Sequence, residues 1–125
     1  MQIALRELLT ETNRLLKPDQ FNDYCPNGLQ VEGKPLIRHL VSGVTASQRF
    51  LDAAVEQGAD AVLVHHGYFW RGEDAVITGL KRKRIKTLLD NDISLLAYHL
   101  PLDAHAEFGN NVQLAHPLGF VPSGA

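Results

Sequence analysis

The sequence predicts an α/β fold with a parallel or mostly parallel sheet and crossover helices. Three apolar strand patterns, at residues 39–45, 60–66 and 93–99, alternate with amphipathic helix patterns. The strands are nearly continuous apolar runs, which is typical of strands that helices cover on both faces. A length of 125 residues is that of one domain, so we expect a single α/β domain over residues 1–125.

Each element follows from local signals along the chain. Residues 2–17 carry leucines at helical spacing, and the helix should end at Lys17 because the residue before a proline disfavours helical backbone. The turn formers in "DYCPNGLQVEG" (23–33) predict a long loop. Ser47 as N-cap and Gly58 as C-cap predict a helix between the first two strands.

The remaining elements repeat the same alternation of strand and helix. Residues 79–91 predict a helix whose apolar side chains face inward, namely Leu80, Ile85, Leu88 and Leu89. Residues 109–118 predict a third crossover helix after strand 93–99. We therefore expect three strand–helix pairs in succession, the pattern of a parallel sheet.

Composition and charge exclude several classes of function. The formal net charge is -2, whereas nucleic-acid-binding domains are usually basic, so we expect no nucleic-acid partner. The apolar runs are far shorter than the ~20 residues that a membrane helix needs. Arg6, Glu7 and Glu11 interrupt the apolar core that a signal peptide would require. The single cysteine, Cys25, fits the reducing cytosol, so we expect a cytoplasmic protein.

Polar side chains gather where the predicted strands end. Thr45, the pair His65-His66, and His99 follow the three strands, and Asp103 lies just beyond. Ligands of open parallel sheets bind at the carboxyl ends of the strands, and histidine with aspartate suits divalent transition metals. Neighbouring strand residues point to opposite faces, so the two histidines could serve two adjacent ions bridged by the carboxylate.

Other interpretations of these residues stay open. A histidine at a strand end is more often a hydrogen-bonded or surface residue than a ligand, and we give His39, His105 and His116 that role. His99 stands between these two roles, because it could orient a metal-binding side chain without itself binding the metal. Cys25 is expected to be structural or incidental. The basic run 81–86 is expected to be a solvated helix face, and the aromatics at 68–70 either stack on a base or, preferably, cover a subunit interface.

Four segments carry a resemblance to a known family: "DYCPNGLQVEG", "GVTAS", "GADAVLVHHGYFW" and "HLPLDAHAEFGNN". They resemble the YbgI-type dinuclear metal-centre family, the GTP cyclohydrolase I type 2 homologues, over roughly residues 3–120. The resemblance implies that His65 and His66 are metal ligands and that Asp103 bridges two divalent ions, which could be Zn, Fe, Mn or Mg. It also implies an α/β fold, a hexameric ring whose sites face an inner cavity, and hydrolytic opening of the guanine ring of GTP.

The same resemblance implies that the sequence is the N-terminal half of a larger two-part fold. The second half of family members supplies another histidine and a glutamate to the site, so residues 1–125 hold only its first part. The favoured function is a metal-dependent hydrolase of a nucleotide-like substrate. The alternative is a non-enzymatic, homo-oligomeric scaffold or interaction protein with structural metals.

Overall fold

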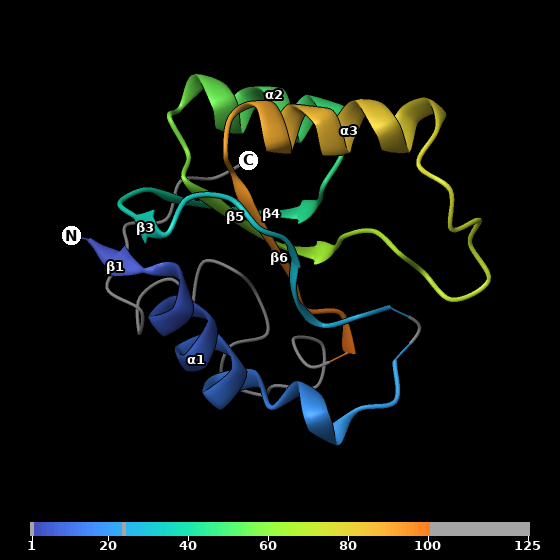
Figure 1. Cartoon of the computed structure of the whole chain (residues 1–125). Coiled ribbons are helices and arrows are strands. Elements are labelled where there is room, and N and C mark those ends of the chain that lie inside the picture. The colour runs from blue at the N-terminus through green and yellow to red at the C-terminus, as the bar shows by residue number, and fades with distance from the viewer. Residues whose placement is uncertain (1, 24, 101–125) are drawn as a thin grey trace.

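A four-stranded mixed sheet lies at the centre of the protein (Figure 1). The computed structural model describes residues 2–23 and 25–100, so the helix expected at 109–118 and Asp103 lie outside the described residues. The strand order is β2-β6-β5-β4, and the bounds are β2 Gly28–Val31, β4 Leu40–Thr45, β5 Ala61–His66 and β6 Ser94–Ala97. Strands β4, β5 and β6 are parallel, which confirms the predicted α/β class.

Helices cover both faces of this sheet, as the apolar strands predicted (Figure 1). The crossover helices α2 (Gln48–Glu56) and α3 (Gly79–Asp90) lie side by side on one face, and α1 (Leu5–Leu16) lies on the other. Ser47 caps α2, because its side chain accepts a hydrogen bond from the Phe50 N–H at 3.2 Å. Gly58 follows the end of α2 with φ +73°, a conformation that favours glycine.

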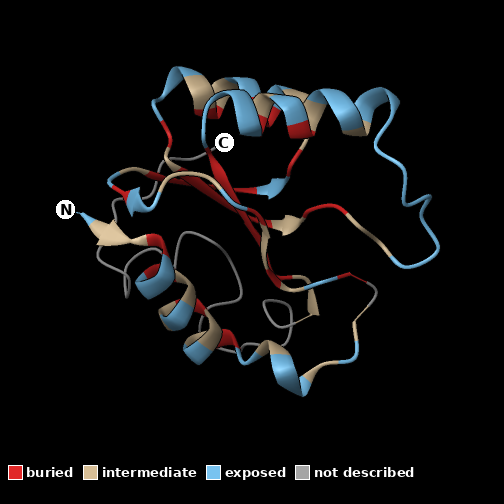
Figure 2. Ribbon diagram, in the orientation of Figure 1, coloured by how far each residue is buried: buried red, intermediate tan, exposed pale blue. Residues whose placement is uncertain are grey.

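The strands supply two separate apolar cores because their side chains alternate between the faces. Val62 and Val64 of β5 pack under α2 and α3, whereas Ala61 and Leu63 pack under α1. All four are buried, and the sheet is the most completely buried part of Figure 2. Within residues 2–23 and 25–100, no helix combines the length and apolar character needed to cross a membrane.

Two predicted element boundaries are wrong by more than two residues. Residues 28–31 form strand β2 instead of continuing the loop, because they pair antiparallel with β6 with a shift in register between Leu29 and Val31. The N-terminal helix begins at Leu5 instead of residue 2, because β1 (Ile3–Ala4) pairs antiparallel with β3 (Leu36–Ile37). Strands β1 and β2 each form by pairing with residues that are distant in the sequence. A short 3-10 turn, η1 (Pro18–Gln20), follows α1.

The inward orientation predicted for Leu80 and Leu89 is also wrong, since their exposed fractions are 65% and 53%. Helix α3 meets the sheet through one narrow stripe, Ile85 and Leu88, which are both buried. Leu89 lies about 100° around the helix from Leu88 and therefore points away. Leu80 lies in the first turn of α3. This turn directly follows the exposed segment 71–78 and is exposed as well (Figure 2).

Candidate metal centre

Three imidazole rings meet at the carboxyl ends of the adjacent strands β5 and β6. His65 and His66 are the last two residues of β5, and His99 lies two residues beyond the end of β6. The ring centroids are separated by 4.3 Å (His65–His66), 4.9 Å (His65–His99) and 5.5 Å (His66–His99). Each ring can offer one nitrogen such that all three nitrogens lie within 4.8 Å of one another. That spacing fits a shared metal ion or an adjacent pair.

The end of β5 is fixed by both neighbouring strands. Thr45 is the register partner of His66, and its Oγ1 lies 3.2 Å from Nδ1 of that ring. The carbonyl of His66 accepts a hydrogen bond from the Ala46 N–H at 2.9 Å. The Tyr98 N–H donates to the Val64 carbonyl at 3.0 Å on the other side. Although adjacent strand residues alternate between faces, the rings of His65 and His66 remain neighbours at this edge.

His99 is held by a segment that precedes β2. Oδ1 of Asp23 lies 2.9 Å from the ring nitrogen Nδ1 of His99, and Asn27 Oδ1 accepts from the backbone N–H of His99 at 2.7 Å. Oδ2 of Asp23 accepts from the Leu100 N–H at 2.8 Å and from Nδ2 of Asn27 at 3.0 Å. The Asp23 side chain is only 3% exposed. Asp23 and Asn27 together clamp the chain that carries His99.

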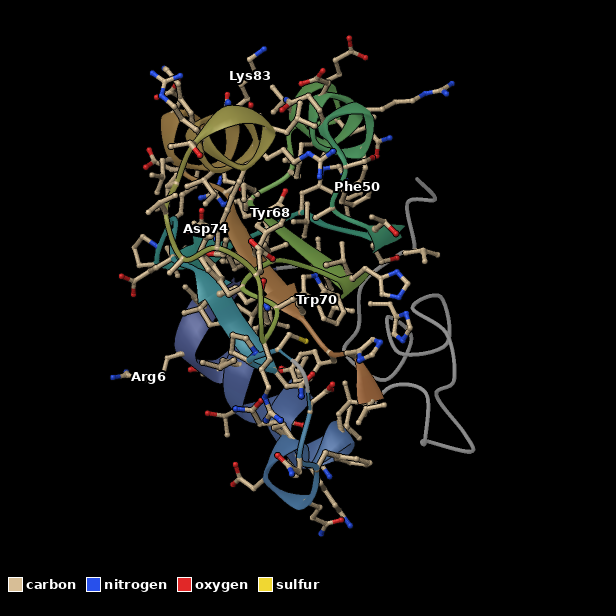
Figure 3. All side chains as sticks on the ribbon, turned by 90° about the vertical axis from the view of Figure 1, so that its right-hand side faces the viewer. Arg6, Phe50, Tyr68, Trp70, Asp74 and Lys83 are labelled. Atoms are coloured by element: carbon tan, nitrogen blue, oxygen red, sulfur yellow. The ribbon has the colours of Figure 1, made fainter. Side chains whose placement is uncertain are left out.

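The aromatic segment after β5 forms one wall of the cluster. The indole of Trp70 lies edge-on to His99, with ring centroids 4.9 Å apart, and its Nε1 donates to the Gly67 carbonyl at 3.2 Å. Trp70 lies below Tyr68 at the strand ends (Figure 3). Tyr68 does not cover an interface, because it is buried and donates its hydroxyl to the Ala46 carbonyl at 2.6 Å. Burial raises the pKa of Tyr68 to about 12.

Gln30 of β2 holds this segment in place. Its Oε1 accepts from the Tyr68 N–H at 2.7 Å, and its Nε2 donates to the Tyr68 carbonyl at 3.0 Å. Gly67 lies so close to β2 and β6 that a Cβ there would meet Gln30 Oε1 at 2.4 Å and the Ala97 Cβ at 2.7 Å. Glycine is therefore required at position 67 for space, and this close packing positions the wall beside the imidazoles.

A second group of potential ligands shares His99 with the first. Asp23, Cys25 and His99 can also bring one ligand atom each within 4.8 Å of one another. Burial, and then the charge of Asp23, raise the pKa of the Cys25 thiol to about 11. A metal ion would have to displace the proton from this thiol, since the thiolate is the form that binds. The imidazole cluster lies at the carboxyl ends of two parallel strands, where such sheets bind ligands, and its nitrogens suit zinc or iron.

The basic run at 81–86 makes local ion pairs. Lys81 contacts Glu73 at 2.9 Å and lies 4.7 Å from the centre of the Phe69 ring. Lys86 contacts Asp90 at 2.6 Å, one helical turn away. Lys86 fits the expected solvated helix face, whereas the Lys81 side chain is only 14% exposed and packs against residues that precede α3.

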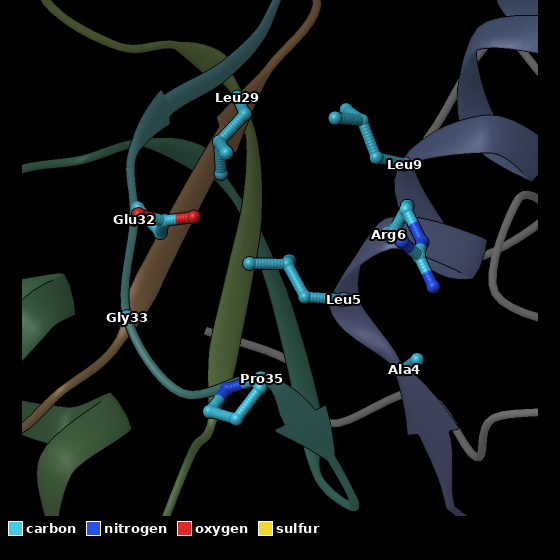
Figure 4. Close-up of a pocket in the computed structure, with 8 residues that line it drawn as sticks. All are labelled: Ala4, Leu5, Arg6, Leu9, Leu29, Glu32, Gly33 and Pro35. Carbon is cyan, nitrogen blue, oxygen red and sulfur yellow. The ribbon is translucent and has the colours of Figure 1, made fainter.

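A groove of about 510 Å³ lies apart from the imidazole cluster, between α1 and the segment that follows β2 (Figure 4). Leu5 from α1 and Glu32 from the facing segment both point into it (Figure 4). Its lining residues are Ala4, Leu5, Arg6, Leu9, Leu29, Glu32, Gly33 and Pro35. The lining includes none of the three clustered histidines, so the groove is separate from the candidate centre.

The sequence pattern singles out three of the clustered side chains but misses the groups that hold them. His65, His66 and His99 come together as their strand ends predicted, while Asp103 lies outside the described residues. Asp23 and Asn27 carry only the signal of turn residues. Their partner His99 is more than 70 residues away in the chain, so no local pattern could connect them.

Comparison with curated proteins finds close relatives that are longer. The chain is 65% identical over 124 residues to a Pseudomonas aeruginosa protein named "GTP cyclohydrolase 1 type 2 homolog", covering 99% of this chain and 49% of the relative. It is 60% identical over 118 residues to the Escherichia coli protein of the same name, covering 94% of this chain and 48% of the relative. The chain thus spans about half the length of the curated relatives it matches.

Solved structures show the same fold. The structural-genomics protein ybgI, described as of unknown function, matches with a TM-score of 0.84 and 60% identity, over 94% of this chain and 47% of that one. TTHA1606 from Thermus thermophilus matches with a TM-score of 0.82 and 42% identity, over 95% of this chain and 49% of that one. The family model for Duf34/NIF3 (NGG1p interacting factor 3) matches residues 3–123. The chain therefore belongs to the Duf34/NIF3 family.

Proposed function

We propose that the chain supplies the first part of a dinuclear metal centre in a hydrolase that acts on a nucleotide-like substrate. The observation that carries this proposal is the cluster of three imidazole nitrogens within 4.8 Å at the ends of β5 and β6. The carboxyl edge of a parallel sheet is where such folds bind their ligands. The name of the relatives, GTP cyclohydrolase 1 type 2 homolog, suggests a guanine nucleotide as the first substrate to test.

Each residue of the centre has a separate task. His65 and His66 would hold two divalent ions together with Asp103, and His99 adds a third imidazole beside them. The ions, which we expect to be zinc, iron, manganese or magnesium, would supply Lewis-acid polarisation and an activated water when bound. Trp70 closes one side of the cluster and offers an aromatic edge to a planar base.

We further propose that the chain works as a homo-oligomer, a hexameric ring in the resemblance stated above. The longer relatives would contribute the remaining ligands from the part of their length that lies beyond the match. Substrate would then bind against the carboxyl edge of β4, β5 and β6.

Metal content and turnover together test the hydrolase proposal. The chain is loaded separately with Zn²⁺, Fe²⁺ and Mn²⁺, and bound metal is measured in the wild type, His65→Ala and the control His39→Ala, whose residue lies at the opposite end of the parallel strands. We expect metal to be lost only in His65→Ala, and GTP hydrolysis to require metal. Metal content unaffected by His65→Ala would refute the site, and absence of nucleotide turnover in both the metal-loaded chain and the metal-loaded Pseudomonas aeruginosa relative would refute the activity.

The full-length Pseudomonas aeruginosa relative serves as a positive control for both measurements. If it binds metal and turns over nucleotide while the 125-residue chain binds metal without turnover, the activity requires the part of the relative beyond the match. This comparison separates a weak site from an absent activity.

A scaffold with structural metals is the second candidate, and one observation favours it. Three large apolar side chains that follow closely in sequence at the start of α3 are more than half exposed, namely Val76, Ile77 and Leu80. Exposed apolar side chains of this kind often mark interfaces between proteins. If the protein is a scaffold, chelation changes the oligomeric state in size-exclusion chromatography and no metal-dependent nucleotide turnover is seen. If it is a hydrolase, chelation abolishes turnover.

A further inference from the structure

Asp23 carries a buried carboxylate that contacts His99, one of the three clustered imidazoles. Its side chain is 3% exposed and lies with Oδ1 at 2.9 Å from Nδ1 of His99. Its other oxygen, Oδ2, accepts two N–H groups, from Leu100 at 2.8 Å and from Asn27 at 3.0 Å. Hydrogen bonds of this kind favour the ionised carboxylate. An ionised carboxylate only accepts hydrogen bonds, so the proton in the contact with His99 must lie on Nδ1 of the ring.

This contact decides which nitrogen His99 can offer to a ligand. With Nδ1 protonated and bound to Asp23, a neutral imidazole carries its lone pair on Nε2. The backbone N–H of His99 is fixed at the same time by Asn27 Oδ1 at 2.7 Å, so ring and backbone are held by the same short segment. Histidines that bind a metal through one ring nitrogen commonly donate a hydrogen bond from the N–H of the other to a carboxylate.

We propose that Asp23 is the positioning residue of the centre: it fixes His99 as the Nδ1–H tautomer and thereby presents Nε2 to the ions held by His65 and His66. The inference rests on the proposed metal centre for its consequence, but the tautomer itself is a property of the metal-free chain. Asp23 is not a catalytic residue, since it acts through His99. Asn27 supports both members of the pair through its amide group.

The substitution Asp23→Asn tests the tautomer directly because an amide has one donor and one acceptor end. If the amide oxygen takes the place of Oδ2, it keeps the bonds from Leu100 and Asn27, and the NH₂ group then faces Nδ1 of His99. An NH₂ group can only donate, so His99 must move its proton to Nε2. In the opposite amide orientation the NH₂ group would face the N–H groups of Leu100 and Asn27, which are also donors, so that orientation is disfavoured.

The first measurement is the nitrogen chemical shifts of the His99 ring in metal-free protein, recorded as the pH is raised until they no longer change. His99→Gln identifies the signals by their loss. We expect the Nδ1–H tautomer in the wild type and in the control Asp19→Asn, an exposed aspartate of the same segment. Asp23→Asn should show the Nε2–H tautomer. An Nε2–H tautomer in the wild type, or an unchanged tautomer in Asp23→Asn, would overturn the proposal.

The second measurement is the affinity for Co²⁺ alone, followed by its visible absorption. Asp23→Asn should raise the dissociation constant about 10–100-fold, the usual effect of losing such a partner, while Asp19→Asn leaves it unchanged and the melting temperature of both variants stays close to that of the wild type. Equal Co²⁺ affinity in Asp23→Asn and the wild type would overturn the positioning role. Absence of Co²⁺ binding in every variant would refute the metal centre and leave the tautomer result to decide the role of Asp23.

Discussion

Gly67→Ala is the substitution that most directly tests how the wall of the centre is built. The added Cβ would lie 2.4 Å from Gln30 Oε1 and 2.7 Å from the Ala97 Cβ. Gln30 could rotate away, but Ala97 is part of β6 and is completely buried, so the backbone at Gly67 has to shift. The φ angle of Gly67 is outside the left-handed region; the substitution therefore probes space alone and adds no backbone strain.

The expected loss of stability has two parts. Overpacking a filled site costs about 1–3 kcal/mol. Displacing the segment also breaks the hydrogen bond from the Tyr68 N–H to Gln30, which adds about 1 kcal/mol. The free energy of unfolding should therefore fall by about 2–4 kcal/mol, the range of severe single substitutions.

Urea denaturation gives the free energy of unfolding, and fluorescence of Trp70, the single tryptophan of the sequence, reports the position of the wall. The matched control is Gly72→Ala, whose Cβ would meet nothing within 4 Å but whose φ of +84° is left-handed. That control should lose about 1 kcal/mol from backbone strain. A loss in Gly67→Ala no larger than in Gly72→Ala, with unchanged Trp70 emission, would refute the argument from close packing.

Three further predictions concern stability and metal. Asp60→Asn should lower the free energy of unfolding at pH 7 by about 1–3 kcal/mol in urea denaturation, because the carboxylate accepts the backbone N–H groups of Arg38 and His39. Burial opposes the charge of Asp60, but the hydrogen bonds from Lys34 and these amides lower its pKa overall. The contribution of Asp60 to stability should therefore be lost on acidification below the usual pKa of about 4. A difference in stability between wild type and variant that does not change with pH would contradict this. Burial raises the pKa of Tyr98 to about 12, above the ordinary value near 10, so stability should fall as the pH rises from about 10 toward 12; denaturation midpoints that stay level over that range would disprove the assignment. Zn²⁺ should raise the melting temperature of the wild type but not of His65→Ala, and an equal rise in both would exclude His65 as a ligand.

The sequence predicts the central part of the fold well because its strands are buried on both faces. The apolar runs that form β4, β5 and β6 need no partner information to be recognised, and Ser47 signals the start of α2 locally. Strand β2 is only four residues long and lies among turn formers, so its pairing with β6 alone defines it. Helix periodicity likewise cannot say how wide a stripe the sheet covers, and the inward placement of Leu89 fails for that reason.

The candidate site divides in the same way. His65, His66 and His99 can be placed together because the ends of parallel strands share one edge of a sheet. Asp23 cannot, since its carboxylate meets His99 through a fold that brings residues 76 apart in sequence into contact. Trp70 stands out in the sequence as an aromatic beside histidines, but whether it forms a wall or an interface depends on the close packing at Gly67.

The clamp formed by Asp23 and Asn27 also sets how easily the candidate centre opens in the folded protein. The amide protons of His99 and Leu100 are held by side chains of a loop and not by a neighbouring strand, so their exchange with solvent requires only that this loop detach. Such local openings need less free energy than global unfolding. The two amides should therefore exchange earlier than that of Tyr98, which donates to Val64 within the sheet. The candidate centre should therefore open locally at this loop while the strands of the sheet stay paired.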